Sequence, residues 1–461
     1  MDNQFRLGTL APEKLQQNFA EVQPGLTPKA AMEESNRCLY CYDAPCIKAC
    51  PTSINIPSFI KRIATGNVKG AAKTIMESNP VGASCARVCP TEELCEGACV
   101  LNDASEPIAI GLLQRYATDW AMESGKPLFE PGPSNGKKVA VIGAGPAGLS
   151  AARELARDGF AVKVYDSKPL AGGLNTHGIV SFRLPQSVAL WEAEQVANLG
   201  VDIQTGITVG KDISAEQLIS DNDAVVLAAG MGNVPSLGIE GENLSGVYDA
   251  IQFVESTKTM ANAASIKLSG ARVAVIGAGN TAIDAATCSV RLGADNVKIV
   301  YRRTKDEMTA YDFEYDFAKQ DGVEFSWLTA PKRIIGDSEG KVTHLECVRM
   351  VLSGNGGKDG RPVPVPVEGS EFLMPVDAVI LAIGQTRHNA LIEAFGLRHD
   401  RGVVIVDDVT KQTSDPKVYA AGDIVFGAGG GEAMVVSAAE QGKQAAKAII
   451  GKFAPQNHVI I

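Results

Sequence analysis

The feature that most restricts the fold of this chain is a glycine-rich motif that occurs twice. Residues 138–149 read Lys-Val-Ala-Val-Ile-Gly-Ala-Gly-Pro-Ala-Gly-Leu, and residues 272–283 read Arg-Val-Ala-Val-Ile-Gly-Ala-Gly-Asn-Thr-Ala-Ile. Each is an apolar run of strand length, followed by a glycine turn and then a helical pattern. This order is typical of a dinucleotide-binding βαβ unit, in which the helix N-terminus faces the phosphates. The two copies predict an α/β protein with two Rossmann-like domains.

Each position in the motif has a physical role. Gly143 and Gly277 allow the tight turn, and Gly145 and Gly279 let the backbone approach a pyrophosphate. The third small residue of each motif lets the helix pack closely on the strand. The other motif residues expected to contact the cofactors are Pro146, Ala147, Gly148, Asn280 and Thr281.

The strands that follow the two motifs end in side chains of opposite charge. The strand 161–165 ends at Asp166, whose carboxylate can accept hydrogen bonds from ribose hydroxyls and would repel a 2′-phosphate. The strand 297–301 ends at Arg302 and Arg303, and arginine accommodates a 2′-phosphate. We therefore expect FAD at the first motif and NAD(P)H at the second, with NADPH favoured. In the alternative, one arginine stacks on adenine, the other is solvated, and NADH is the donor.

Further segments complete the two predicted domains. The loop of Gly172, Gly173 and Leu174 can approach the diphosphate or the flavin. Two similar apolar strands end at Gly230 and Gly384, close their sheets and carry the chain between the domains. The stretch 413–423 ends in Gly422 and Asp423, with a helix expected from about Glu432 to Ile450, and it resembles the second FAD fingerprint of two-dinucleotide flavoproteins. For His177 we favour a packed loop position over an acid–base role.

The predicted FAD domain is thus interrupted by the nicotinamide domain. We expect an iron–sulfur domain over residues 1–125, the first part of the FAD domain over 137–262, the NAD(P) domain over 263–374 and the second FAD part over 375–461. Residues 126–136, rich in proline and glycine, read as a linker.

The cysteines are concentrated near the N-terminus. Eight of the ten lie between Cys38 and Cys99, as two groups with short spacings and Cys-Pro pairs: Cys38, Cys41, Cys46 and Cys50, then Cys85, Cys89, Cys95 and Cys99. Such spacing lets thiolates converge, and it resembles the bacterial ferredoxin pattern. Iron–sulfur clusters are the favoured interpretation and zinc the alternative. Helical patterns over 57–64, 68–77 and 110–120 predict a small α-helical domain around the clusters.

Charge and hydropathy narrow the function. The net charge is −10, so the chain lacks the basic footprint that is typical of a nucleic-acid-binding surface. No apolar run approaches the roughly 20 residues that span a bilayer, and residues 1–6 lack the layout of a secretory signal. A cytoplasmic protein without nucleic-acid or membrane partners is expected.

The whole chain resembles the glutamate synthase small-subunit superfamily, and within it the electron-input subunits of bacterial dihydropyrimidine dehydrogenase. The resemblance is carried by residues 38–51, 82–99, 110–115 and 182–188, and Arg183 in the last segment is a candidate cofactor contact. It implies two [4Fe–4S] clusters. One would be bound by Cys38, Cys41, Cys46 and Cys99, and the other by Cys50, Cys89, Cys95 and the amide of Gln114, which leaves Cys85 spare; counting cysteines alone would choose Cys85.

The resemblance also implies a function. NAD(P)H would reduce FAD, and two [4Fe–4S] clusters would deliver electrons to an FMN-containing subunit that reduces uracil or thymine, in a heterotetramer. The alternatives are the small subunit of NADPH-dependent glutamate synthase and a non-catalytic electron-relay or assembly scaffold.

Overall fold

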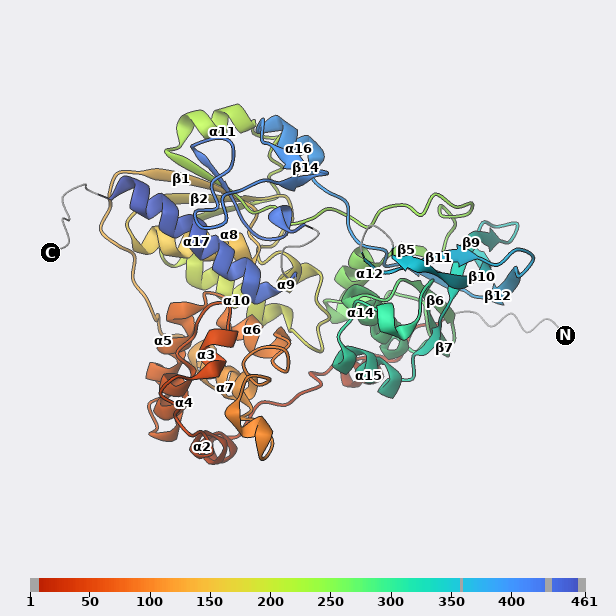
Figure 1. Cartoon of the computed structure of the whole chain (residues 1–461), viewed down its shortest axis with the longest axis horizontal. Helices are drawn as coiled ribbons and strands as arrows, with labels where there is room; N and C mark the ends of the chain where they lie inside the picture. Colours follow the sequence, from red (N-terminus) through yellow and green to blue (C-terminus); the bar gives the residue numbers. More distant parts are fainter. Residues whose placement is uncertain (1–7, 357–359, 428–432, 455–461) are drawn as a thin grey trace. The chain divides into compact units, whose positions relative to one another are not determined.

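The structure is a computed structural model that describes residues 8–356, 360–427 and 433–454 (Figure 1). The N-terminal stretch 1–6 and Glu432, which were used in the predictions above, lie outside these residues. Contacts divide the chain into two units: unit 1 contains residues up to Glu21, His177–Phe182 and Gly232–Thr386, and unit 2 contains Val22–Thr176, Arg183–Met231 and the chain from Arg387 onward. In the described part of the chain, no helix is long and apolar enough to cross a membrane.

Unit 2 begins with a helical domain. Its helices cover the three predicted helical stretches, and Phe59, Ile60, Ile75 and Leu113 lie in its core. The helices are α2 (Pro28–Asn36), α3 (Pro45–Ala49), α4 (Ile56–Ala64), α5 (Val68–Ser78), α6 (Gly82–Val88), η1 (Val100–Asp103) and α7 (Ile110–Ser124).

The rest of unit 2 is a parallel five-stranded sheet of order β16-β4-β1-β2-β3 with helices around it. The strand β16 comes from the end of the chain and pairs with β4, so this sheet is assembled from two separate segments of the chain. Its elements are β1 (Lys138–Ile142), α8 (Pro146–Arg157), β2 (Ala161–Asp166), α9 (Leu174–His177), α10 (Gln186–Ala197), β3 (Asp202–Thr205), α11 (Ala215–Asp221), β4 (Ala224–Leu227), α16 (Asn389–Ala394), β14 (His399–Asp400), β15 (Val403–Val404), β16 (Val418–Ala420), η3 (Asp423–Val425) and α17 (Val435–Phe453).

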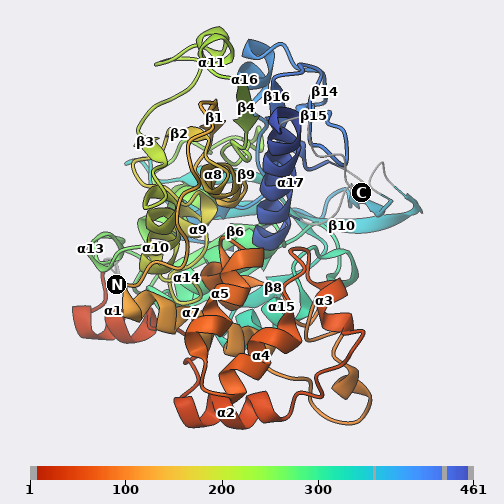
Figure 2. The same cartoon turned by 90° about the vertical axis from the view of Figure 1, so that its left-hand side faces the viewer.

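The long helix α17 lies directly against α8 (Figure 2). A Cβ atom at Gly442 would lie 2.0 Å from the carbonyl oxygen of Ala147, so the two helix backbones are in contact. The C-terminal helix therefore supports the helix that follows the first glycine motif.

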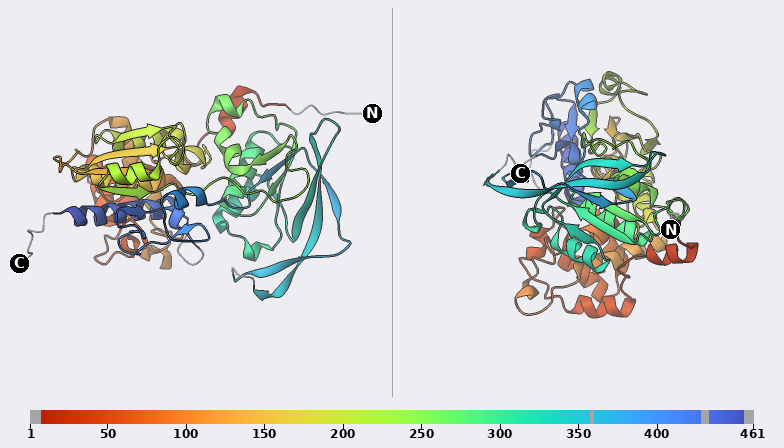
Figure 3. Two further views of the ribbon diagram at one scale, coloured as in Figure 1. Left: turned by 90° about the horizontal axis from the view of Figure 1, so that it is seen from above. Right: turned by 90° about the vertical axis from the view of Figure 1, so that its right-hand side faces the viewer.

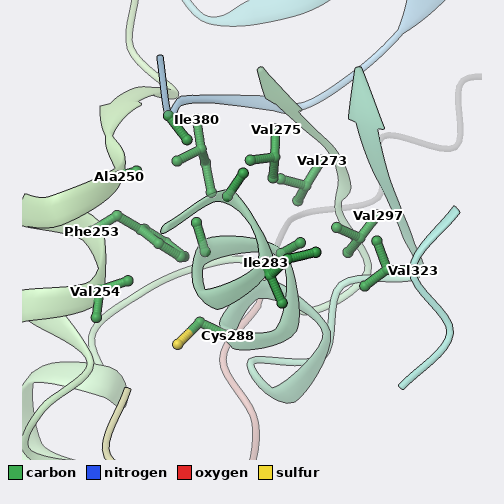
Figure 4. Close-up of a cluster of buried hydrophobic side chains, with 14 of the residues drawn as sticks. Ala250, Phe253, Val254, Val273, Val275, Ile283, Cys288, Val297, Val323 and Ile380 are labelled. Atoms are coloured by element: carbon green, nitrogen blue, oxygen red, sulfur yellow. The ribbon is translucent and has the colours of Figure 1, made fainter. Parts of the chain in front are cut away.

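Unit 1 repeats the architecture with a parallel sheet of order β5-β13-β6-β7-β8. Val273, Val275, Val297 and Ile380 from its strands pack with Phe253 and Ile283 in one buried cluster (Figure 4). The elements are α1 (Pro12–Asn18), β5 (Val247–Asp249), α12 (Ala250–Ser256), α13 (Met260–Ala263), β6 (Arg272–Ile276), α14 (Asn280–Arg291), β7 (Asn296–Val300), η2 (Lys305–Glu307), α15 (Asp312–Gln320), β8 (Glu324–Ser326), β9 (Thr329–Gly336), β10 (Val342–Gly356), β11 (Pro362–Pro366), β12 (Phe372–Pro375) and β13 (Ala378–Leu381).

A second sheet of unit 1 is antiparallel and was not predicted. The strand β10 pairs with β9, β11 and β12, and Figure 3 shows these strands as an extended ribbon.

The boundaries between the two units differ from the domain boundaries expected from the sequence, which were residues 262 and 374. Residues 232–262 and 375–386 lie in unit 1, because β5 and β13 pair with each other and β13 pairs with β6. The described residues up to Glu21 also belong to unit 1, where the Asn18 side chain donates a hydrogen bond to the carbonyl of Arg291, at 2.8 Å. The strands ending at Gly230 and Gly384 look alike in sequence, so nothing in them tells which sheet each one joins.

Candidate functional sites

The first glycine turn in unit 2 leaves an open face beside Gly145. Gly143 has φ +103°, and a Cβ there would lie 2.2 Å from the carbonyl oxygen of Ala228. Gly148 is equally confined, since its Cβ would lie 1.9 Å from the carbonyl oxygen of Gly143. Gly145 differs, because its nearest neighbour would be the Cα of Gly173 at 3.7 Å. Two of the glycines thus serve the fold, whereas the space beside Gly145 is open.

The second loop of the predicted FAD site lies against the turn. Gly173 has φ +56°, and a Cβ there would lie 2.7 Å from the Cα of Gly145. Pro146 begins α8, and Ala147 is buried behind it. Leu174 is exposed and Arg183 is half-buried. The geometry thus brings together the two glycine loops of unit 2.

Asp166 has a structural role that the sequence did not indicate. Its carboxylate accepts hydrogen bonds from the backbone N–H of Ala144, at 2.7 Å, and of Lys168, at 2.8 Å. The acid therefore fixes the backbone of the glycine turn.

The C-terminal fingerprint, Gly422 and Asp423, lies against α8. Gly422 has φ +79°, its N–H donates to Oε1 of Gln441 on α17 at 2.8 Å, and a Cβ there would lie 3.0 Å from the Cβ of Ala147. Burial raises the pKa of Asp423, and the charge of Arg387 opposes this shift. Arg387 also donates to the carbonyl of Asp423, at 3.0 Å. The helix α17 begins at Val435 rather than near Glu432, which lies outside the described residues.

The second glycine turn, in unit 1, has the same geometry. Gly277 has φ +123°, and a Cβ there would lie 2.2 Å from the carbonyl oxygen of Ala382. A Cβ at Gly279 would meet only Oγ1 of Thr309, at 3.2 Å. Asn280 and Thr281 begin α14, and Oδ1 of Asn280 accepts the N–H of Tyr311 at 3.3 Å.

Two glycines that end the central strands are also alike. Gly230 has φ +67° and Gly384 has φ +96°, and no atom lies within 4 Å of a Cβ built at either. Each unit therefore has an open left-handed glycine after the strand beside its motif strand.

The two arginines after β7 have different environments. Arg303 is buried, and its Nε donates a hydrogen bond to the carbonyl of Pro362 at 2.9 Å. Arg302 is exposed. The two neighbouring arginines therefore differ, since Arg303 is enclosed by the protein and the side chain of Arg302 is open to solvent.

His177 is a packed histidine, as favoured above. It is 5% exposed, and its Nδ1 lies 2.9 Å from Oε1 of Glu255; both residues belong to unit 1.

Four cysteines of the helical domain line one pocket. These are Cys38, Cys41, Cys46 and Cys99, together with apolar residues such as Ile60 and Ile110. Burial raises the pKa of Cys46 to about 11, so a bound cation is needed to hold it as a thiolate near neutral pH. Soft sulfur donors in an apolar pocket fit an iron–sulfur cluster.

The remaining cysteines of the domain lie near one another. A side-chain hydrogen bond that the Cys89 thiol donates to Cys85, and then burial, raise the pKa of Cys89, which also interacts electrostatically with Cys95 and Cys50. In the described residues, no three His, Cys, Asp or Glu side chains converge on a single metal ion, whereas a [4Fe–4S] cluster takes one protein ligand at each iron.

Gln114 contacts α6, the helix that carries Cys85. It is 7% exposed on α7, and its Nε2 donates to the carbonyl of Gly82 on α6 at 2.7 Å. Because Nε2 is used in this way, Oε1 is the amide atom that can act as a ligand.

Sequence reasoning did not single out Glu192, a buried acid. Glu192 on α10 is 1% exposed, and it accepts hydrogen bonds from the N–H groups of Ala83 and Ser84, each at 2.8 Å. Its spacing from Val188 and Val196, both buried, placed it on the apolar stripe of the helix. That spacing was the available signal.

Comparison with known proteins agrees with this arrangement. Residues 15–126 match the family described as dihydropyrimidine dehydrogenase domain II, 4Fe-4S cluster, and residues 137–445 match the pyridine nucleotide-disulphide oxidoreductase family. The glutamate synthase [NADPH] small chain of Escherichia coli (strain K12) is 36% identical over 445 residues, which cover 94% of this chain and 93% of the relative. The NAD-dependent dihydropyrimidine dehydrogenase subunit PreT of the same organism is 38% identical over 436 residues, covering 94% and 97%.

Solved structures share the fold. Mycobacterium tuberculosis FprA in complex with NADPH has a TM-score of 0.55 at 22% identity, covering 68% of this chain and 84% of that one. Thioredoxin reductase of T. acidophilum has a TM-score of 0.54 at 24% identity, covering 68% and 99%.

The fold and the sites define an NAD(P)H-dependent flavin and iron–sulfur oxidoreductase. The chain belongs to the pyridine nucleotide-disulphide oxidoreductase family, in the group that includes dihydropyrimidine dehydrogenase subunit PreT and the glutamate synthase small chain.

Proposed function

We propose that this chain is the cytoplasmic electron-input subunit of a dihydropyrimidine dehydrogenase. It would take reducing equivalents from NAD(P)H and pass single electrons to a partner subunit that carries FMN and reduces uracil or thymine, in a heterotetramer. When bound, the nicotinamide supplies a hydride, FAD accepts the electron pair, and iron–sulfur clusters conduct single electrons. The similarity to PreT over 94% of this chain supports the proposal.

The observation that carries it is a direct contact inside unit 2 between the flavin fold and the cysteine domain. Val436 and Ala439 of α17 pack with Val81 and Cys85 of the α6 region in one buried cluster. The helix that would face FAD therefore contacts α6, which carries Cys85 and whose C-cap is Cys89, a proposed cluster ligand that packs against the same group of buried residues. Such a contact is what electron transfer out of a flavin requires.

We further propose two [4Fe–4S] clusters in unit 2. Cys38, Cys41, Cys46 and Cys99 would bind one cluster, and the pocket that they line supports this set. Cys50, Cys89, Cys95 and Gln114 would bind the other. The Cys85→Ala variant should then keep about eight irons per chain, whereas a loss of about four would assign Cys85 as the ligand.

In each unit, a distinct set of residues would hold the nucleotide. The turn at Gly145, with Asp166 at its base, would hold the adenosine diphosphate half of FAD. The turn at Gly279 would hold NAD(P)H, and exposed Arg302 would bind a 2′-phosphate. NADPH is therefore the proposed donor, although the relative PreT is named as NAD-dependent.

An anaerobic titration with NADPH and NADH in turn tests the first half of the proposal. Either nucleotide should bleach the flavin absorbance, and the purified chain should reduce an artificial acceptor while leaving uracil unchanged. No bleaching by either nucleotide would favour a non-catalytic scaffold, and uracil reduction by the chain alone would refute the division between subunits.

A second candidate is the small chain of a glutamate synthase, because that relative matches over 93% of its own length at 36% identity. Adding the pyrimidine-reducing subunit or the glutamate synthase large subunit separates the two. The physiological partner should restore NAD(P)H-dependent turnover of its own substrate, and the other should not.

A further inference from the structure

The corner between α5 and α6 is held by charged side chains of the flavin fold. Arg153 of α8 donates to the carbonyl oxygens of Met76 and Glu77, and Lys443 of α17 donates to the carbonyl of Ser78 at 2.6 Å. These cations lie at the C-terminus of α5, where the helix dipole favours positive charge. Glu192 of α10 lies at the N-terminus of α6, where the dipole favours negative charge.

Glu192 is bound more tightly than a simple cap requires. Both N–H groups named above and the Ser84 hydroxyl donate to its carboxylate. Burial raises the pKa of Glu192 to about 7, and these hydrogen bonds oppose the shift. Three donors facing one carboxylate fit the ionised group, which can only accept.

The peptide group between Gly82 and Ala83 connects Glu192 to Gln114. Its N–H donates to Glu192 at 2.8 Å, and its carbonyl accepts Nε2–H of Gln114 at 2.7 Å. A negative charge at the N–H end polarises the peptide and strengthens the hydrogen bond at its carbonyl end. That bond in turn orients the Gln114 amide and increases the electron density on Oε1.

We propose that Glu192 is a positioning residue for the amide ligand Gln114, and that its charge, relayed through the Gly82–Ala83 peptide, lowers the reduction potential of the cluster bound there. The inference rests on the proposed ligand set of the second cluster. Partners of this kind commonly fix and tune a metal ligand. The reduction potential of the first cluster, whose cysteines line the pocket described above, should not depend on Glu192 through this route.

The variant Glu192→Gln tests the proposal with little change of shape. The carboxamide oxygen of the variant can still accept from both N–H groups, and its NH₂ group can donate to the Ser84 hydroxyl, which also accepts. We expect unchanged iron content and one cluster that is easier to reduce. At a fixed potential, its ratio of reduced to oxidised form should rise about tenfold, equivalent to about 59 mV for one electron.

The measurement is an anaerobic redox titration of the purified chain, followed by EPR at a pH above about 7, where Glu192 is ionised. Lys443→Met is the matched control, because it loosens the same corner without touching the Gly82–Ala83 peptide. An equal shift in the control, or no shift in Glu192→Gln, would overturn the proposal.

A double variant tests the route. Gln114→Glu keeps an oxygen ligand but removes the Nε2–H donor, so Glu192→Gln should produce no further shift in that background. A full shift there would overturn the relay. If Cys85→Ala loses about four irons, the ligand set itself fails, and this result is distinct from a failure of Glu192.

Discussion

Replacing Gly145 by alanine should separate cofactor binding from folding. Gly145 has φ −79° and ψ −177°, which any residue adopts. The new Cβ would meet only the Cα of Gly173 at 3.7 Å, an ordinary contact. Alanine also reduces the conformational freedom of the unfolded chain, so the stability of the FAD-free protein should change by less than about 1 kcal/mol.

The Gly145→Ala substitution should instead weaken the binding of FAD. The added methyl group occupies the face through which the backbone would approach the diphosphate. Losing one hydrogen bond to a charged group costs about 1.5–3 kcal/mol, and this corresponds to a dissociation constant about 10- to 100-fold higher.

Gly143→Ala is the matched control. Its Cβ would lie 2.2 Å from the carbonyl oxygen of Ala228, at φ +103°. Backbone strain and overpacking should together cost about 3 kcal/mol or more, so this variant should lose stability before cofactor is considered.

The assay combines the thermal midpoint of the FAD-free protein with FAD binding followed by flavin fluorescence. Wild-type affinity for FAD in Gly145→Ala would refute the assigned role of this turn. Equal thermal midpoints for the two variants would refute the steric reasoning.

Three further predictions concern unit 1. Gly279→Ala should raise the dissociation constant for NAD(P)H about tenfold or more and leave the FAD content unchanged, as measured by nucleotide titration and flavin absorbance. Arg302→Gln should raise the KM for NADPH about tenfold with little effect on the KM for NADH, whereas Arg303→Gln should lower the thermal midpoint. If steady-state kinetics show the increase in the KM for NADPH in Arg303→Gln and not in Arg302→Gln, Arg303 is the phosphate-binding residue. Burial lowers the pKa of Lys258 to about 8, so between pH 8 and about 10.4 the folded chain holds fewer protons than the unfolded chain and stability should rise with pH; denaturation scans of Lys258→Met should lack this rise.

The local parts of the fold could be predicted from the sequence because their signals are local. The motif strands β1 and β6 and the helices α4, α5 and α7 follow from periodicity and from glycine spacing. The interrupted flavin domain was instead expected from the resemblance of residues 413–423 to a second FAD fingerprint. The unit boundaries did not follow, since the apolar strands β4 and β13 carry the same pattern and only pairing with β1 or β6 distinguishes them.

The hydrogen bonds of Glu192 and Arg303 are long-range, and this is why sequence patterns did not reveal them. Glu192 lies 109 residues from Ala83, whose N–H it accepts. Arg303 was expected to face a nucleotide, but its Nε is bound to a carbonyl 59 residues further along the chain. A single buried charge leaves no period in the sequence, so only its position on an apolar stripe could have marked Glu192.

Strand register refines the comparison between the two nucleotide sites. In unit 2, Ile142 pairs with Tyr165, and Asp166 follows directly. In unit 1, Ile276 pairs with Val300, so Tyr301 occupies the place of Asp166 and Arg302 lies one residue beyond it. Side chains alternate between the two faces of an extended chain, and Tyr301 is indeed buried while Arg302 is exposed. The acid therefore points inward to hold its own turn, whereas the arginine points outward. A one-residue offset in register, as well as an exchange of charge, therefore separates Asp166 in unit 2 from Arg302 in unit 1.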